Sequence, residues 1–211
     1  VSGVVPSRTP REILRNVKLQ VTPGAAVLIG TDQEVGIRQD VSNVETESTG
    51  QVLLPAARVV SILRELTDDM VTLEATDRSL VLKGGQSDFK LSTEDPAEFP
   101  AVSGFEDEQY FTLPANVFRG MIRRTVFATD VESTRYALGG ILLEFSPEKA
   151  TLAATDSRRL SVVHAACQCV GECNLDSAKP VVPAKAMQLI ERSLPDSEDE
   201  VYHRKLKALT F

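Results

Sequence analysis

The chain has 211 residues, 42% of them hydrophobic, with a formal net charge of -7 and a pI near 5.0. This length allows one large or two ordinary domains with hydrophobic cores. The acidic balance argues against a chain covered with nucleic-acid-binding surface, although one basic face is compatible with an acidic exterior. No apolar run approaches the roughly 18 residues of a membrane span, and the start of the chain lacks the apolar stretch of a secretion signal. We therefore expect a cytoplasmic protein.

A hairpin and an amphipathic helix are the first predicted elements. Residues 14–32, LRNVKLQVTPGAAVLIGTD, predict a β-hairpin, because proline at the second turn position presets its backbone angle. Pro55 predicts a helix start, since proline costs little in a first turn. The apolar residues that recur after it at helical spacing are Val59, Ile62, Leu63 and Leu66.

Further strands and a linker are expected next. Residues 70–75 and 79–83 predict a second hairpin, and residues 87–91 add a strand. The acidic, proline-rich segment TEDPAEFPAVSGFEDE, residues 93–108, is typical of a linker. We therefore predict two domains, residues 1–104 and 105–211.

The second half begins with a strand and an amphipathic helix in residues 110–124, YFTLPANVFRGMIRR. Helical spacing separates an apolar face from a basic one. The side chains expected to face a core are Phe118, Met121, Ile122 and Val126, and the basic side chains on the remaining surface are Arg119, Arg123 and Arg124.

The chain also repeats itself. Residues 138–156, LGGILLEFSPEKATLAATD, align with residues 14–32 without a gap, and seven of nineteen positions are identical. Ordinary composition gives about one identity by chance. Residues 55–68 and 183–196 share six of fourteen positions, so a helix is also expected after Pro183. We infer a tandem duplication of an α+β unit.

The register of the repeat indicates that both copies are incomplete. The first unit has no counterpart of the strand and helix in residues 110–124, and the second lacks counterparts of the last strands of the first. Incomplete sheets leave unpaired edges. We therefore expect the chain to be part of a larger protein.

A Thr-Asp pair ends the hairpin in both units, as Thr31-Asp32 and Thr155-Asp156. A feature shared by both copies is expected to serve the common fold, and aspartate readily turns a chain by bonding its own backbone. Beyond the pair the units diverge, and only the second carries Ser-Arg-Arg-Leu at residues 157–160. We expect the binding specificity of the protein to reside in this segment.

Several segments, in order, resemble the bacterial DNA polymerase III beta subunit family, the sliding clamps. They are LIGTDQEVGI, FATDVESTRYALGGILLEF, ATDSRRL and VVPAKAMQLI. The resemblance implies an α+β tandem repeat of clamp domains, with antiparallel sheets outside and amphipathic helices on the inner face of a ring around duplex DNA. Two chains of three domains each would close the ring head to tail. This chain would supply most of domains one and two and none of the third.

The implied function is that of a non-catalytic processivity factor, which tethers the replicative DNA polymerase to duplex DNA independently of sequence. The implied partners are the clamp loader, other proteins with clamp-binding motifs and a second copy of the chain, with no cofactor or metal. Tyr136 matches a family position that touches DNA, and near it Glu132 and Ala137 differ from the residue types usual in the family. The residues expected to contact DNA are Arg8, Arg58, Arg64, Arg119, Arg123, Tyr136 and Lys185.

The resemblance also implies half of a groove that captures short peptides from partner proteins, with its other wall in the third domain. The family motif Gly-His-Arg-Leu is Ser-Arg-Arg-Leu here, so Ser157 and Arg158 are expected to alter peptide preference. The groove residues expected in this chain are Leu138, Thr155, Ser157, Arg158, Arg159 and Leu160.

The residues themselves leave other interpretations open. A duplicated protein-interaction module that does not bind DNA would suit the acidic charge. Catalysis is not expected, because His164 and His203 are accompanied by no glycine-rich phosphate loop and no paired nucleophile and base. The spacing of Cys167, Cys169 and Cys173 favours a reduced loop over a structural zinc site, which usually uses two separated cysteine pairs.

Overall fold

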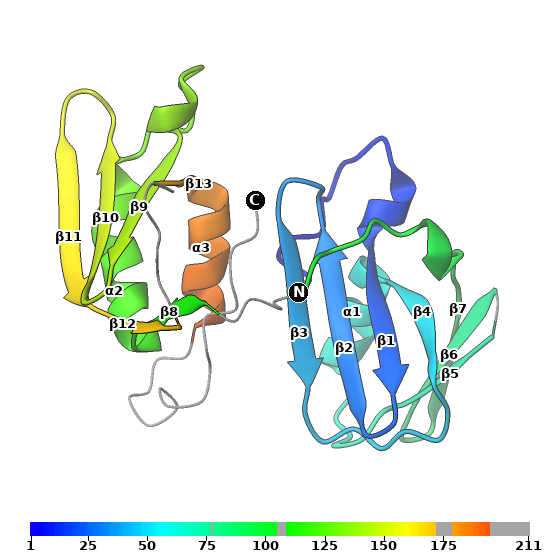
Figure 1. Ribbon diagram of the computed structural model, residues 1–211. Helices are drawn as coiled ribbons and strands as arrows, with labels where there is room; N and C mark the ends of the chain where they lie inside the picture. Colours follow the sequence, from blue (N-terminus) through cyan, green and yellow to red (C-terminus); the bar gives the residue numbers. More distant parts are fainter. Residues whose placement is uncertain (77, 105–108, 172–178, 195–211) are drawn as a thin grey trace. The chain divides into compact units, whose positions relative to one another are not determined.

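The computed structural model describes residues 1–76, 78–104, 109–171 and 179–194. The chain forms two compact units, Val1–Gly104 and Phe105–Phe211, each with its own sheets and helices (Figure 1). The helices in the described ranges all fall short of the length and apolar character needed to cross a bilayer. Residues 201–211 lie outside the described residues.

Unit 1 is built on a four-stranded antiparallel sheet with the order β3-β2-β1-β4. The strands are β1 (Asn16–Thr22), β2 (Ala25–Thr31), β3 (Gly36–Val41) and β4 (Gly50–Pro55), and α1 (Ala56–Glu65) follows β4 directly. A second antiparallel sheet contains β5 (Thr72–Ala75), β6 (Ser79–Gly84) and β7 (Ser87–Ser92). Two short 3-10 helices are η1 (Glu12–Arg15) and η2 (Pro96–Glu98). The predicted hairpins and the helix after Pro55 are confirmed.

The four-stranded sheet of unit 1 is buried on both faces, because successive side chains of a strand point to opposite sides. Val52 and Leu54 of β4 pack in a core with Val59 of α1 and with the leucines of β6. Leu53, between them, packs in a second core with Phe99 and with residues of η1. The amphipathic helix and the segment after β7 therefore cover opposite sides of this sheet.

Unit 2 contains a four-stranded antiparallel sheet with the order β11-β10-β9-β13, and a small sheet of β8 and β12. The strands are β8 (Tyr110–Thr112), β9 (Gly140–Ser146), β10 (Lys149–Thr155), β11 (Leu160–Ala166), β12 (Gln168–Val170) and β13 (Val181–Pro183). The helices are α2 (Ala115–Thr125), η3 (Val126–Ala128), η4 (Tyr136–Leu138) and α3 (Ala184–Ser193).

The two longer helices of unit 2 cover one face of its four-stranded sheet. Helix α2 contacts β10 and β11, and α3 contacts β9 and β13. Phe118 and Ile122 of α2 and Met187 of α3 have no exposed surface. The predicted inward face of α2 is confirmed for Phe118, Met121 and Ile122, whereas Val126 is only partly buried because the α-helix ends at Thr125.

The two units share one scaffold. Strand order β3-β2-β1-β4 in unit 1 corresponds to β11-β10-β9-β13 in unit 2, and α1 and α3 each follow the last of these strands in the chain. The four strands and the helix of each unit correspond in the register that the sequence repeat predicts. The tandem duplication is therefore confirmed.

The Thr-Asp pair forms a hydrogen-bonded turn in unit 2. Thr155 Oγ1 donates to the carbonyl of Arg159 at 2.7 Å and accepts from the N–H of Ser157 at 3.2 Å. Asp156 Oδ1 accepts from the N–H groups of Arg158 at 3.0 Å and Arg159 at 2.9 Å. Both side chains therefore satisfy backbone groups that the tight turn leaves without a strand partner.

Unit 1 repeats this turn bond for bond. Thr31 Oγ1 donates to Val35 O and accepts from Gln33 N, both at 2.9 Å. Asp32 Oδ1 accepts from Glu34 N at 3.0 Å and from Val35 N at 2.8 Å. These contacts support the prediction that the Thr-Asp pair belongs to the common fold.

The turn imposes a left-handed backbone on its third residue in both units. Gln33 has φ 80° and Ser157 has φ 72°. A non-glycine residue in this region costs about 1–2 kcal/mol, because its Cβ approaches the following carbonyl. Ser157 therefore carries strain at the position where the family motif has glycine.

Ser157→Gly is expected to stabilise the protein. Relief of the strain exceeds the extra chain entropy of glycine, about 0.5–1 kcal/mol, so the melting temperature should rise by about 2 °C. Thermal unfolding followed by circular dichroism measures this. Arg158→Gly is the matched control, because Arg158 is exposed and is not among the described residues with positive φ. A fall in melting temperature equal to that of the control would contradict the assignment of strain.

Candidate DNA and peptide interfaces

Three of the predicted DNA-contacting arginines lie in unit 1. Arg8 precedes η1, and Arg58 and Arg64 lie on α1; all three are exposed. The buried residues of α1 are Ala56 and Val59, so Arg58 and Arg64 occupy the remaining surface of the helix. None of the three pairs with an acidic side chain of the described residues. Their charges are therefore available to a partner.

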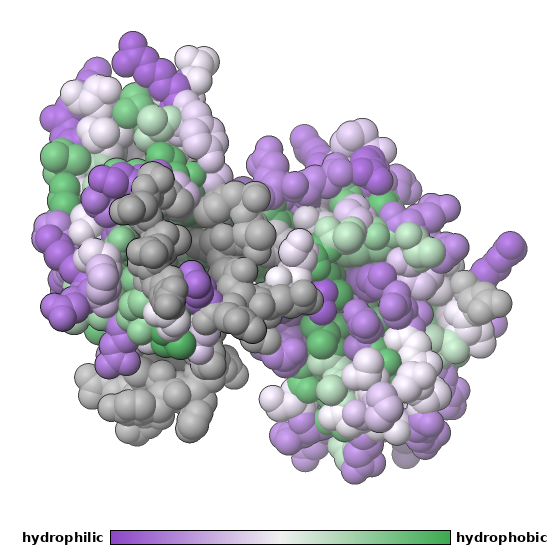
Figure 2. All heavy atoms as spheres, in the orientation of Figure 1, coloured by the Kyte–Doolittle hydropathy of each residue, from purple (hydrophilic) through white to green (hydrophobic). Residues whose placement is uncertain are grey.

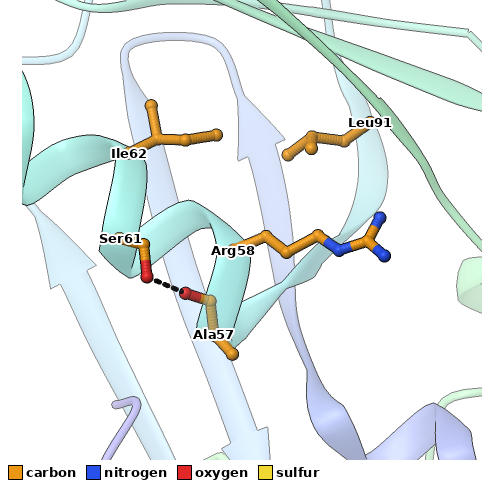
Figure 3. A pocket seen from close by; sticks show the side chains of 5 residues that line it. All are labelled: Ala57, Arg58, Ser61, Ile62 and Leu91. Carbon is orange, nitrogen blue, oxygen red and sulfur yellow. Dashed lines mark hydrogen bonds between the residues drawn. The ribbon is translucent and has the colours of Figure 1, made fainter.

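Arg58 also borders an open, mainly apolar depression between α1 and β7 (Figure 3). The depression is lined by Ala57, Arg58, Ser61, Ile62 and Leu91. Ser61 Oγ donates to the carbonyl of Ala57 at 2.9 Å, so this hydroxyl is satisfied within the helix. The guanidinium of Arg58 is the charged group of this surface.

Two arginines of α2 share one carboxylate of α3 in unit 2. Arg119 Nε lies 3.2 Å and Arg123 Nε 2.6 Å from Oε1 of Glu191. The Arg119 side chain is 15% exposed and the Arg123 side chain 58%. The hydrogen bond from Arg123 is the main cause that lowers the pKa of Glu191, and Arg119 adds to it. Arg123 is therefore the member of the predicted pair that faces solvent, and Arg119 is largely covered.

The helices α2 and α3 carry five basic residues and a single acidic one. Lys185, in the first turn of α3, is exposed, as are Arg124 and Arg192. The acidic residue is Glu191. A chain with a net charge of -7 thus presents a local excess of positive charge on these helices.

Tyr136 lies in η4 and is 69% exposed. Its hydroxyl donates to the carbonyl of Val181 at 2.9 Å, which fixes the side chain against β13. The exposed ring offers a flat surface, and the side chain is held at the same end of the sheet at which α3 begins. Glu132 and Ala137, which depart from the family types, are exposed nearby in the chain.

The predicted peptide-binding residues of the second unit, apart from Leu138, lie in one turn between β10 and β11. Arg159 Nε donates to Asp156 Oδ2 at 2.9 Å, and its guanidinium carbon lies 5.5 Å from the centre of the Phe127 ring. The backbone N–H groups of Arg158 and Arg159 lower the pKa of Asp156, and the Arg159 side chain adds to this effect. The guanidinium of Arg159 is thus held between a carboxylate and an aromatic ring, at a distance typical of a cation–π contact.

Exposed apolar side chains flank this turn. Leu160 is 69% exposed, Phe127 55% and Val162 45%. On the face shown in Figure 2, hydrophobic residues lie in small groups among hydrophilic ones. Phe127 and Val162 were missed by the sequence interpretation, although the alternation along β11 places Val162 on the same side of the strand as Leu160.

Leu138 emerges at the same end of the sheet as the turn. It closes η4 directly before β9, which runs antiparallel to β10, and β10 ends at Thr155. Leu138 is partly buried, and its carbonyl accepts from the N–H of Asp130 at 2.7 Å. The topology therefore brings Leu138 and the turn to one end of unit 2. Figure 1 shows that the connection between β10 and β11 lies at the end of the sheet where β9 begins.

The cysteine cluster differs from the prediction. Cys167 is a buried free thiol that donates to the carbonyl of Ser146 at 3.3 Å, and burial raises its pKa. Cys169 is disulfide-bonded, so the expectation of a reduced loop is wrong for this residue; spacing alone does not encode redox state. Cys173 and His203 lie outside the described residues. Across the described ranges, no group of histidine, cysteine and acidic residues gathers to hold a metal ion.

Several curated relatives of this chain share one description, beta sliding clamp. The chain is 31% identical over 200 residues to the beta sliding clamp of Escherichia coli, and 34% over 202 residues to that of Salmonella typhimurium. Each alignment covers 94% of this chain and 54% of the relative, so the chain spans about half the length of these proteins.

Solved structures agree with the sequence comparison. The DNA polymerase III subunit beta from Pseudomonas aeruginosa superimposes with a TM-score of 0.81 at 30% identity, covering 94% of this chain and 53% of that one. A putative DNA polymerase III beta subunit from Eubacterium rectale gives a TM-score of 0.82 at 26% identity, with the same coverage.

Two family descriptions match most of the chain. Residues 1–103 match the N-terminal domain of the DNA polymerase III beta subunit, and residues 112–204 match its central domain. The two matches fall in the two structural units, one in each. The chain therefore belongs to the DNA polymerase III beta subunit family, the bacterial beta sliding clamps.

Proposed function

We propose that this chain forms part of a ring-shaped sliding clamp, which encircles duplex DNA and tethers the replicative DNA polymerase during DNA replication. The proposal includes a third clamp domain beyond domains 1–104 and 105–211, and two copies of the complete protein closed head to tail. The length of the relatives supports the further domain, because they are about twice as long as this chain.

The observation that carries the DNA-binding part is the charge of α2 and α3. They hold five basic residues and one acidic residue in a chain with a net charge of -7. Their apolar faces are buried against the sheet, which leaves Arg123, Arg124 and Lys185 on the outer surface. Positive side chains on the surface of a helix suit contact with phosphates, which is independent of sequence.

Arg8, Arg58, Arg64, Arg119, Arg123, Tyr136 and Lys185 form our proposed DNA-contacting set. Arg58, Arg64 and Arg123 offer exposed guanidinium groups, and Tyr136 offers an exposed ring. The Arg119 side chain is only 15% exposed, so Arg119 contributes mainly through Glu191, the carboxylate that it shares with Arg123. A ring that must slide cannot depend on base-specific contacts, so loose electrostatic contacts with phosphate are the suitable chemistry.

The turn after Thr155 is our candidate for one wall of a groove that binds partner peptides. Leu160 and Phe127 supply exposed apolar surface, and Arg159 supplies a positioned donor. Peptide grooves combine such apolar walls with a few placed polar groups. The polymerase, the clamp loader and other proteins with a clamp-binding motif are the proposed occupants, with Leu138, Thr155, Ser157, Arg158, Arg159 and Leu160 as the lining residues in this chain.

The ring itself is testable by topology. The complete protein, loaded onto DNA, should stay with circular duplex through gel filtration and leave a linear duplex from its ends. This follows because encirclement, and not affinity, would hold the protein in place. A protein-interaction module that does not bind DNA would elute apart from both substrates, and that result would overturn the clamp function for this protein.

Charge reversal of Arg8 and Arg58 together should weaken duplex binding. Each lost phosphate contact flattens the salt dependence of log affinity by about 0.9, so the slope should fall by about 2 for the pair. Fluorescence anisotropy with a short labelled duplex across about 50–200 mM salt measures this. Primer extension with the complete protein should also lose processivity.

Charge reversal of Lys90 and Lys149 is the matched control. Both lysines are exposed on strands, outside the helices, and their reversal changes the net charge by the same amount. Equal losses in the two double variants would mean that overall charge, and not these arginines, governs binding.

A pentapeptide with the family's clamp-binding motif should bind the complete protein and bind this chain weakly or not at all, because half of the groove would be missing. Isothermal titration calorimetry compares the two, with a scrambled peptide as the control. Equal affinity for the two proteins would show that unit 2 alone forms the site, and would refute the two-walled groove.

A further inference from the structure

Glu191 occupies an unusual place on the helices that we propose to face DNA. It is the single acidic residue among five basic ones on α2 and α3. Its carboxylate lies between Arg119 and Arg123, with its Oε1 3.2 Å and 2.6 Å from their Nε atoms. One negative charge is thus placed inside the positive cluster.

The shared fold does not require an acid at this position. In the repeat alignment Glu191 corresponds to Leu63 of α1, while the next residue, Arg192, corresponds to Arg64. Leu63 is 46% exposed, so the equivalent position in unit 1 is a surface position occupied by an apolar residue. A feature present in only one copy is free to serve a function specific to that copy.

The geometry gives Glu191 a defined effect on Arg123. The Glu191 side chain is 19% exposed and the Arg123 side chain 58%, so the bond lies at the border between the helix packing and solvent. The carboxylate engages Arg123 through Nε, on one edge of the guanidinium. Because the guanidinium is planar, a bond at this edge limits the directions in which the rest of the group can point.

On the basis of the proposed function, we propose that Glu191 is a positioning residue that offsets one positive charge of the α2–α3 surface by holding the exposed guanidinium of Arg123. The consequence is a weaker and more loosely held contact with duplex DNA than five basic residues would otherwise give. This suits a protein that moves along DNA, since electrostatic attraction to phosphate increases with each unpaired cation.

Glu191→Gln tests the proposal, because glutamine keeps the shape and a hydrogen-bond acceptor but removes the charge. The expected result is binding to a short random-sequence duplex that is about 3- to 10-fold tighter at about 0.1 M salt, with a log–log salt slope steeper by about 0.9. Glu148→Gln is the matched control, because Glu148 is an exposed residue of the β9–β10 turn and its substitution changes the net charge equally.

Glu191→Asp separates charge from shape. Aspartate retains the negative charge on a shorter side chain, so the salt slope should stay at the wild-type value even where the melting temperature falls. A purely structural role for Glu191 would lower the melting temperature of both Glu191 variants and leave the slope unchanged.

The outcomes distinguish this proposal from the proposed function. Equal slopes for Glu191→Gln, Glu148→Gln and wild type, with measurable DNA binding, would overturn the role of Glu191 alone. No duplex binding by any of these proteins at about 50 mM salt would overturn both the DNA contact of unit 2 and the role of Glu191.

Discussion

Burial of one face of the four-stranded sheet in unit 2 against α2 and α3 determines how the rest of this unit is presented. Ile141, Leu152 and Val182 on the sheet and Phe118 and Ile122 on α2 have no exposed surface. Burial of each such side chain contributes about 1.5–3 kcal/mol, whereas an ion pair near the surface contributes about 0–1 kcal/mol. The rotation of the helices is therefore set by apolar packing, and the positions of the basic side chains follow from it.

The duplication explains which residues are free to vary. In both units a threonine and an aspartate close the turn between the second and third strands with equivalent hydrogen bonds. At the fifth residue of the turn, unit 1 has Val35 and unit 2 has Arg159, whose side chain bonds the second oxygen of the same aspartate. The scaffold is thus retained, and in unit 2 its aspartate also supports an exposed arginine.

Much of the fold could be predicted from local pattern. Helix starts at Pro55 and Pro183 and the two proline hairpins depend on residues close together in the chain, and the structure has them where expected. The sequence repeat also predicted which elements of the two units correspond, because leucines of the core are kept at equivalent positions in both copies.

The details of the candidate sites depend on contacts between distant residues. Arg119 belongs by periodicity to the exposed face of α2, but Glu191, 72 positions later, covers its charge. Phe127, in η3 directly after α2, was missed by the sequence interpretation, yet it lies exposed beneath Arg159, which is 32 positions away in the sequence. No spacing rule for a single helix or strand contains such pairs, because they arise only when two elements pack.

Net charge is a poor guide to this protein because its acidic and basic residues are segregated. The segment 93–108 and the segment around residues 196–200 concentrate acidic residues, while α2 and α3 concentrate basic ones. At physiological ionic strength the Debye length is about 8 Å, so a phosphate close to α2 senses charges within about that distance far more than charges farther away. The same screening means that an acid moderates those arginines strongly only at short range. Glu191 is the acidic residue of α2 and α3 and lies within contact distance of Arg119 and Arg123, so it moderates the positive charge of this surface locally.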